Sequence, residues 1–145
     1  MATPFIPLTE TFFVAPQITA EDLDAARASG VSLIINNRPD HEEPGQPLGA
    51  TIEAAAKALG LDYVAVPVGA AGISERDLDA FDEAIAATSG AVLAYCRSGT
   101  RSTILRAMAR ARAGTPIDAL IQEAANAGYN LEGHRPLLEA ARSND

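Results

Sequence analysis

Hydrophobic residues along the chain follow two alternating patterns. Short, nearly continuous apolar runs predict buried strands, and longer segments with apolar residues every three or four positions predict helices with one buried face. The runs cover residues 11–14, 31–36, 63–67 and 91–95. Helix-like segments lie between these runs and continue after the last one. This alternation is typical of βαβ units, so we expect an α/β protein with a mostly parallel sheet covered by helices on both faces.

Residues that favour helix ends mark the boundaries of the expected helices. Thr19 and Ser74 are candidate N-caps, and Asp22 lies at the capping-box spacing from Thr19. Thr115 followed by Pro116 predicts another helix start. The expected helices span residues 20–29, 50–59 and 75–88, with further ones beginning at Ser102 and Pro116 and a short last one around Leu138.

The composition fits one globular unit, and we expect residues 1–145 to form a single domain. Hydrophobic residues make up 48% of the chain and charged residues 21%, as in an ordinary globular protein. The single cysteine excludes an internal disulfide and fits a reducing compartment, so a cytoplasmic location is expected. The first ten residues lack the features of a signal peptide, and no apolar run is long enough to span a membrane. The net charge of -8 argues against nucleic acid or an anionic membrane as a partner.

The only cysteine, Cys96, lies between the last expected strand and a helix, and the segment Arg97-Ser98-Gly99-Thr100-Arg101 follows it. Backbone N–H groups converge in such a loop, and the helix dipole adds roughly half a positive charge, so the loop can bind an anion and stabilise a thiolate. A cysteine after an apolar strand can also be a small buried core residue. The adjacent arginines favour a nucleophile, because a buried guanidinium without an anion is costly.

Each residue of this cysteine loop (residues 96–102) has an expected role. Cys96 is the candidate nucleophile, Arg101 can hold oxyanion oxygens with its planar fork of donors, and the Ser102 hydroxyl can hydrogen-bond the thiolate. The remaining loop residues are expected to bind the substrate, chiefly through their backbone N–H groups; they are Arg97, Ser98, Gly99 and Thr100.

The charge distribution supports an anionic substrate. Residues 84–117 contain five arginines and no Asp or Glu, although the protein as a whole is acidic. Two of these arginines belong to the cysteine loop, whereas Arg106, Arg110 and Arg112 are expected to solvate the outer face of the following helix. We therefore expect the partner of this protein to be a small anion.

Ligands of open parallel sheets bind beyond the carboxyl ends of the strands. This rule places residues 36–40, 67–72 and 96–101 around one crevice. Arg38 either contacts substrate there or forms a structural ion pair with Glu42 or Glu43. His41 and His134 are expected in a solvated loop and a turn. Their spacing from the cysteine matches no metal site, so neither a metal nor a cofactor is expected.

The segment of residues 95–102 resembles the active-site loop of rhodanese sulfurtransferases and, less closely, the Cys-x5-Arg loop of cysteine-dependent protein phosphatases. Here four residues separate Cys96 from Arg101, one fewer than in that phosphatase motif. Over nearly its whole length the chain resembles the bacterial family called beta-lactamase hydrolase-like protein, phosphatase-like domain. The matching pieces are residues 34–40, 66–68, the cysteine loop and residues 127–130. This resemblance implies a dual-specificity-phosphatase-like, three-layer α/β/α fold with a four-stranded sheet in the order 1-4-2-3.

Two departures from the phosphatase pattern bear on the chemistry. Tyr95 stands where the phosphatase motif usually has histidine, and residues 68–72 lack the aspartate that serves as general acid in dual-specificity phosphatases. Asp40 is the best substitute acid, or else has a turn role, and Asp77 is a weaker candidate. The shorter loop encloses less volume, which favours a single sulfur atom on Cys96 over a phosphoryl group.

Three functions therefore remain open. In the first, a phosphatase-like hydrolase, Cys96 attacks phosphorus while the loop amides and Arg101 hold the oxygens of a small phosphoester. In the second, a sulfurtransferase, Cys96 takes sulfane sulfur from a donor and carries it as a persulfide. In the third, the domain binds an anion without chemistry. The resemblance over the whole chain favours the first function, and the loop length with the missing acid favours the second.

Overall fold

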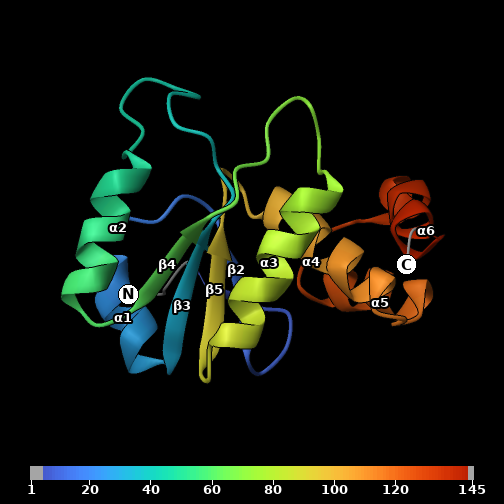
Figure 1. Cartoon of the computed structure of the whole chain (residues 1–145), viewed down its shortest axis with the longest axis horizontal. Coiled ribbons are helices and arrows are strands. Elements are labelled where there is room, and N and C mark those ends of the chain that lie inside the picture. Colours follow the sequence, from blue (N-terminus) through green and yellow to red (C-terminus); the bar gives the residue numbers. More distant parts are fainter. Residues whose placement is uncertain (1–4, 144–145) are drawn as a thin grey trace.

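A five-stranded sheet lies at the centre of the computed structural model, which describes residues 5–143 (Figure 1). The strands are β1 (Ile6–Pro7), β2 (Phe12–Ala15), β3 (Val31–Asn36), β4 (Asp62–Ala65) and β5 (Ala91–Tyr95). Their order in the sheet is β1-β2-β5-β3-β4, with β1 antiparallel to β2 and all other neighbours parallel. The four strands expected from the sequence are therefore present in the order 1-4-2-3, and the α/β class is confirmed.

The short edge strand β1 is the one strand that the sequence analysis missed. It pairs only Ile6 and Pro7 with Val14 and Phe13 of β2. A two-residue strand is too short to show a period of two in its hydrophobic residues. Proline lacks a backbone N–H group and suits an edge position, where the missing donor breaks no ladder.

Helices fill the intervals between the parallel strands and form the C-terminal part of the chain. They are α1 (Asp22–Ala28), α2 (Gly49–Ala58), α3 (Glu75–Ala87), α4 (Thr100–Arg112), α5 (Ile117–Asn126), the 3-10 helix η1 (Glu132–His134) and α6 (Arg135–Ser143). These bounds lie close to the expected ones. No helix within residues 5–143 has the length and apolar character that a membrane crossing requires.

The two N-caps expected from the sequence have different outcomes. Ser74 caps α3 as expected: its hydroxyl accepts a bond from the backbone N–H of Asp77 at 3.1 Å, and the Asp77 carboxylate accepts one from Ser74 N at 2.9 Å. Thr19 does not cap α1 with its side chain. Its hydroxyl and its backbone N–H both donate to Asp22 Oδ2 instead, at 3.2 and 2.8 Å. A turn therefore precedes the first residue of α1.

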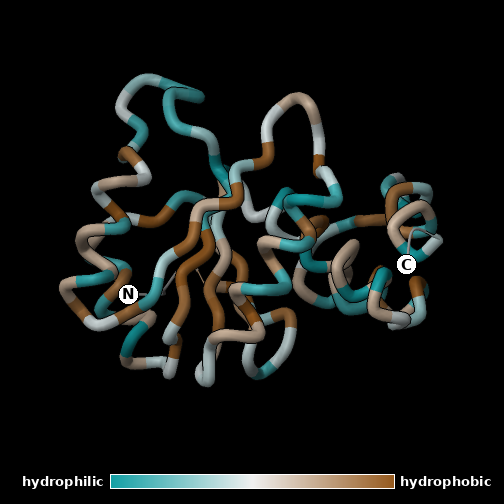
Figure 2. Tube along the Cα trace, viewed as in Figure 1, coloured by the Kyte–Doolittle hydropathy of each residue, from teal (hydrophilic) through white to brown (hydrophobic). Residues whose placement is uncertain are grey.

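Two helical layers enclose the sheet, which gives the three-layer α/β/α arrangement. α1 and α2 cover one face, where Leu23 and Ile52 pack against Ile34 of β3. α3 and α4 cover the other face, where Phe81 belongs to the same core as Ile35. α5 and α6 pack on α4, on its far side from the sheet (Figure 1). Figure 2 shows that hydrophobic residues concentrate along the strands in the middle of the sheet. The central strands β3 and β5 are buried on both faces, whereas β4 at the edge is partly exposed.

The carboxyl ends of β3, β4 and β5 meet at one edge of the sheet, from which two long loops extend (Figure 1). Residues 37–48 join β3 to α2, and residues 66–74 join β4 to α3. Backbone bonds connect these loops to each other and to β5. Asn37 N donates to Tyr95 O at 2.8 Å, and Val68 N donates to Asn37 O at 2.9 Å. The three segments expected around the crevice thus lie together.

Candidate active site

Cys96 is the first residue after β5 and is completely buried. Its sulfur accepts a hydrogen bond from the backbone N–H of Gly99, with an N–Sγ distance of 3.0 Å. Gly99 is also the N-cap of α4 and has a φ of 94°, in the left-handed region that favours glycine. The turn at Gly99 therefore aims an amide donor at the sulfur and starts α4 at Thr100, two residues earlier than expected. A thiol with a donor aimed at it, at a helix N-terminus, is placed as a nucleophilic cysteine requires.

Arg101, in the first turn of α4, is held by two partners in the loops that follow β3 and β4. Its Nη1 donates to Glu42 Oε2 at 2.7 Å and to Val68 O at 2.8 Å, and its Nη2 donates to Glu42 Oε1 at 2.8 Å. The hydrogen bond to Glu42 raises the pKa of Arg101, and the charge of Cys96 raises it further. A guanidinium has five N–H groups. Three are engaged here, and the second Nη2–H and the Nε–H lack an oxygen acceptor within the described part of the chain.

Glu42, in the loop between β3 and α2, lies between two guanidinium groups. Besides its two bonds to Arg101, it accepts a bond from Arg38 Nε at 2.9 Å. The hydrogen bond from Arg101, aided by Arg38, lowers the pKa of Glu42 to about 2. Glu42 is therefore ionised at neutral pH and cannot act as a general acid there. His41, directly before it, has a φ of 66°, a left-handed conformation that is uncommon for a non-glycine residue.

Arg38 is a buried anchor for the same loop. Its Nη1 donates to Gln17 Oε1 at 3.0 Å and its Nη2 donates to Glu43 Oε1 at 2.7 Å, in addition to the bond to Glu42. Of the two roles left open by the sequence, the structure shows the ion pair, and it includes both glutamates. Arg97 is exposed, and its Nη2 lies 3.7 Å from Glu43 Oε2.

Ser102 is buried behind the cysteine loop, but its hydroxyl has a different partner from the one expected. Its Oγ donates to Asn37 Oδ1 at 2.8 Å. The amide nitrogen of Asn37 donates to Val66 O at 2.9 Å, so Oδ1 must be the acceptor. The expected bond from Ser102 to the Cys96 thiolate is therefore absent, because a buried amide needs this hydroxyl. Ser102 instead ties α4 to the end of β3.

The two candidate acids also have structural partners. Asp40 is exposed, and its Oδ1 accepts a bond from the backbone N–H of Gly49 at 2.8 Å, at the start of α2. This bond ties the loop to α2 across nine residues, and is not the local turn that we considered after Pro39. The acid role of Asp40 stays a prediction. Asp77 belongs to the capping box of α3. The Ser98 hydroxyl donates to Thr100 Oγ1 at 3.1 Å and accepts a bond from Thr100 N at 3.5 Å, so the Ser98 side chain is engaged within the cysteine loop.

Comparison with known proteins assigns this arrangement to a family. The model of the family described as beta-lactamase hydrolase-like protein, phosphatase-like domain, matches residues 5–113. The chain belongs to this family. A beta-lactamase hydrolase-like protein from Agrobacterium fabrum is 38% identical over 109 residues, which are 75% of this chain and 25% of that protein. The chain therefore spans about a quarter of the length of this curated relative.

Solved structures agree with the family assignment. A candidate phosphatase from Neisseria meningitidis is 38% identical, with a TM-score of 0.83 over 94% of this chain and 97% of the other. A candidate dual specificity phosphatase from mouse is 19% identical, with a TM-score of 0.70 over 99% of this chain and 89% of the other, and it shows the shared fold. Together with the family match, these findings support a phosphatase-like hydrolase.

One residue of the site lies beyond the part that matches the family model. Tyr129 follows α5, and its hydroxyl donates to the backbone carbonyl of Ser98 in the cysteine loop at 3.0 Å. Burial raises the pKa of Tyr129, and the charge of Cys96 raises it further. The sequence analysis noted residues 127–130 only as part of the family resemblance. No local pattern relates Tyr129 to Ser98, because 31 residues separate them.

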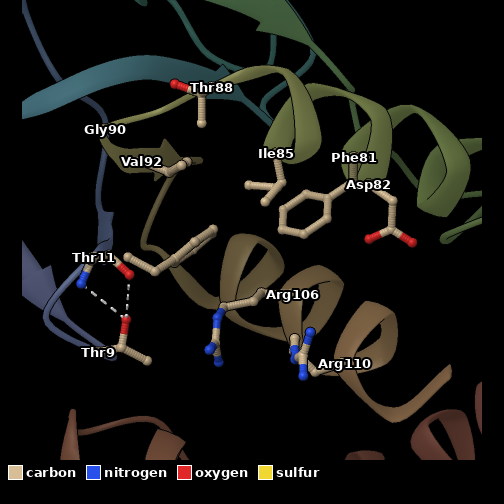
Figure 3. A pocket seen from close by; sticks show the side chains of 11 residues that line it. Thr9, Thr11, Phe81, Asp82, Ile85, Thr88, Gly90, Val92, Arg106 and Arg110 are labelled. Atoms are coloured by element: carbon tan, nitrogen blue, oxygen red, sulfur yellow. Dashed lines mark hydrogen bonds between the residues drawn. The ribbon is translucent and has the colours of Figure 1, made fainter. Parts of the chain in front are cut away.

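A further cavity lies away from this site (Figure 3). It has a volume of about 550 Å³ and lies at the amino ends of β2 and β5, the opposite end of the sheet from Cys96. Figure 3 shows Phe81 and Ile85 of α3 on one side of it and Arg106 and Arg110 of α4 on another. No predicted site residue of this phosphatase-like domain lines it.

Among residues 5–143, no group of three or more His, Cys, Asp or Glu side chains could hold a metal ion.

Proposed function

We propose that this domain is a cysteine-dependent phosphatase-like hydrolase that acts on a small phosphoester. The observation that carries the proposal is the 3.0 Å hydrogen bond from Gly99 N to the buried Cys96 Sγ at the N-terminus of α4. A sulfur in that position, beside an arginine with unused donors, can act as a thiolate toward an oxyanion held above it.

The reaction has two steps. In the first, the Cys96 thiolate attacks phosphorus and forms an S–P bond, while the P–O bond to the leaving group breaks and the leaving oxygen takes the electron pair. In the second, water attacks the phosphocysteine, inorganic phosphate leaves, and the thiolate is restored. The loop amides and the two unused N–H groups of Arg101 hold the non-bridging oxygens in both steps.

The leaving group must depart with little help from a protein acid. Glu42, the carboxylate bonded to Arg101, has a pKa of about 2 and holds no proton at neutral pH. Asp40 is bonded to the start of α2. Without a proton donor, phenolic leaving groups are expected to react much faster than alkyl ones. The substrate class that fits this site is therefore a small aryl phosphate or another phosphate ester with an acidic leaving group.

Sulfur transfer is the second candidate, and the charge of the site favours it. Glu42 neutralises much of the charge of Arg101, and Glu43 pairs with Arg38 and lies near Arg97. The site is therefore less positive than the number of its arginines indicates, which suits a ligand of low charge. With an organic persulfide as a donor of low charge, the Cys96 thiolate would attack the outer sulfur and form a new S–S bond, while the S–S bond of the donor breaks and the donor leaves as a thiolate; Cys96 then carries the persulfide.

Intact-protein mass spectrometry distinguishes these functions. Aryl phosphate is expected to leave one phosphoryl group on Cys96, whereas the sulfurtransferase would gain the mass of one sulfur atom from an organic persulfide. An anion-binding module would bind phosphate and gain neither mass.

A further inference from the structure

We propose that Tyr129 positions the peptide group that stabilises the Cys96 thiolate; the proposal rests on the nucleophilic role given to Cys96 above. Tyr129 Oη donates to the carbonyl oxygen of Ser98 at 3.0 Å. The backbone N–H of Gly99 donates to Cys96 Sγ at 3.0 Å. The Ser98 carbonyl and the Gly99 N–H belong to the same peptide group. One side chain from outside the cysteine loop therefore holds the oxygen of the peptide whose nitrogen faces the sulfur.

The geometry of a peptide group couples these two hydrogen bonds. A trans peptide is planar, so its C=O and N–H groups point in opposite directions and rotate together. The peptide bonds of the described residues are all trans. A hydrogen bond at the oxygen fixes the direction of the N–H group. It also polarises the peptide, which strengthens the N–H as a donor. Both effects stabilise the negative charge on the sulfur.

The contact between Tyr129 and the loop depends on glycine at position 99. A Cβ atom at Gly99 would collide with Tyr129 Oη and would lie 3.0 Å from its Cζ. The backbone φ of 94° at Gly99 excludes most other residues as well. The backbone of Tyr129 is held at the end of α5, because its N–H donates to Ala124 O at 2.8 Å. The segment after α5 thus places the Tyr129 hydroxyl in the space that is left beside Gly99 by the absence of a side chain.

The contribution of Tyr129 to the stability of the thiolate can be tested separately from that of Arg101. The pKa values of Arg101 and Tyr129 are both raised, in part by the charge of Cys96. The Tyr129 hydroxyl therefore keeps its proton at neutral pH and stays a donor. Replacing Tyr129 by phenylalanine removes this donor, keeps the ring, and leaves the contribution of Arg101 in place.

The experiment measures alkylation of Cys96 by iodoacetamide as a function of pH, without any substrate. In Tyr129→Phe the half-maximal rate is expected to shift to higher pH, with a rate near pH 6 about threefold below that of the wild type. The matched control is Tyr63→Phe, which removes a hydroxyl that bonds Asn36 Nδ2 at 2.9 Å, outside the cysteine loop. Its alkylation profile is expected to match the wild type. In parallel, the Gly99 amide proton is expected to move upfield in the NMR spectrum of Tyr129→Phe, because its hydrogen bond weakens.

The outcomes separate this proposal from the proposed function. A wild-type thiol that alkylates like an ordinary exposed cysteine would overturn the nucleophilic role of Cys96 itself. A reactive wild-type thiolate, with an unchanged alkylation profile and an unchanged Gly99 amide shift in Tyr129→Phe, would overturn the role of Tyr129 alone. An equal shift in Tyr63→Phe would also overturn it, because the effect would then not depend on the Ser98 carbonyl.

Discussion

Arg101 in the first turn of α4 and Arg112 in its last turn lie on the same helix in opposite electrostatic settings. Arg112 is at the negative end of the helix dipole, where a cation is stabilised, and it donates to Glu75, Asp79 and Asp82 of α3 at 2.8 to 2.9 Å. The bond to Asp82 is the largest cause that raises the pKa of Arg112. The position of Arg112 is therefore explained by its ion pairs between α3 and α4.

The position of Arg101 is not explained by packing between helices or by the helix dipole. It is at the positive end of the helix dipole, where a second positive charge is unfavourable. It is held there by Glu42, from a loop 59 residues away, and by the Val68 carbonyl. The unfavourable interaction between the charge of Arg101 and the helix dipole is explained if the site binds an anion. The dipole, the loop amides and the guanidinium then all attract the same ligand. We infer from this comparison that an arginine placed against the helix dipole is the better indicator of an anion-binding role.

Replacing Arg101 by lysine is expected to give the largest effect of the changes that test this comparison. An ammonium keeps the charge but cannot bond Glu42, Val68 O and two substrate oxygens in one plane. We expect kcat/KM for an aryl phosphate to fall about a hundredfold. The matched control is Arg97→Ala, which removes an exposed side chain 3.7 Å from Glu43 and is expected to keep most of the activity. Equal losses in the two variants would show that the loop geometry has been misjudged.

A smaller effect is expected on the free energy of unfolding at acidic pH, through Glu42 beside the cysteine loop. The pKa of Glu42 falls from 4.5 to about 2 on folding, so its contribution to stability is fully present above about pH 4.5 and is lost as the pH falls toward 2. Urea unfolding at a series of pH values should therefore show a steeper loss of stability for the wild type than for Glu42→Gln in this range. Parallel losses in the two proteins would contradict the paired state of Glu42.

The smallest effect is expected at the other end of α4. Arg112→Ala removes an ion-pair network whose acidic partners are at least half exposed, so the free energy of unfolding should fall by only about 1 kcal/mol. The kcat/KM for an aryl phosphate should not change. A large loss of activity with intact folding would remove the distinction between the two ends of the helix.

The features predicted from the sequence are those encoded by neighbouring residues. The four parallel strands follow from short apolar runs, and the Ser74 capping box joins residues only three positions apart. The cysteine loop is also local: a strand end, a glycine turn and a helix start lie within a few residues. These signals place Cys96 and Arg101 at the carboxyl edge of the sheet without any knowledge of tertiary contacts.

The side-chain contacts that were missed depend on partners distant in the sequence. The Ser102 hydroxyl bonds Asn37, 65 residues away, and that partner could not be chosen over the thiolate from the sequence. Glu42 was considered as a partner of Arg38, but its two bonds to Arg101 have no local signal in the sequence. Tyr129 reaches the cysteine loop only because α5 packs on α4. Side-chain partners of this kind become visible only when the chain is folded.

The most direct test of the central claim is the mass of the protein quenched during turnover of an aryl phosphate. We predict that a fraction of the wild-type protein gains one phosphoryl group, that peptide mapping places it on Cys96, and that Cys96→Ala gains nothing. Asp40→Asn should still form the adduct, because a phenolic leaving group departs without an acid. A wild-type protein that binds phosphate but never carries a phosphoryl group, while an organic persulfide adds one sulfur atom to Cys96, would contradict the account and identify a sulfurtransferase.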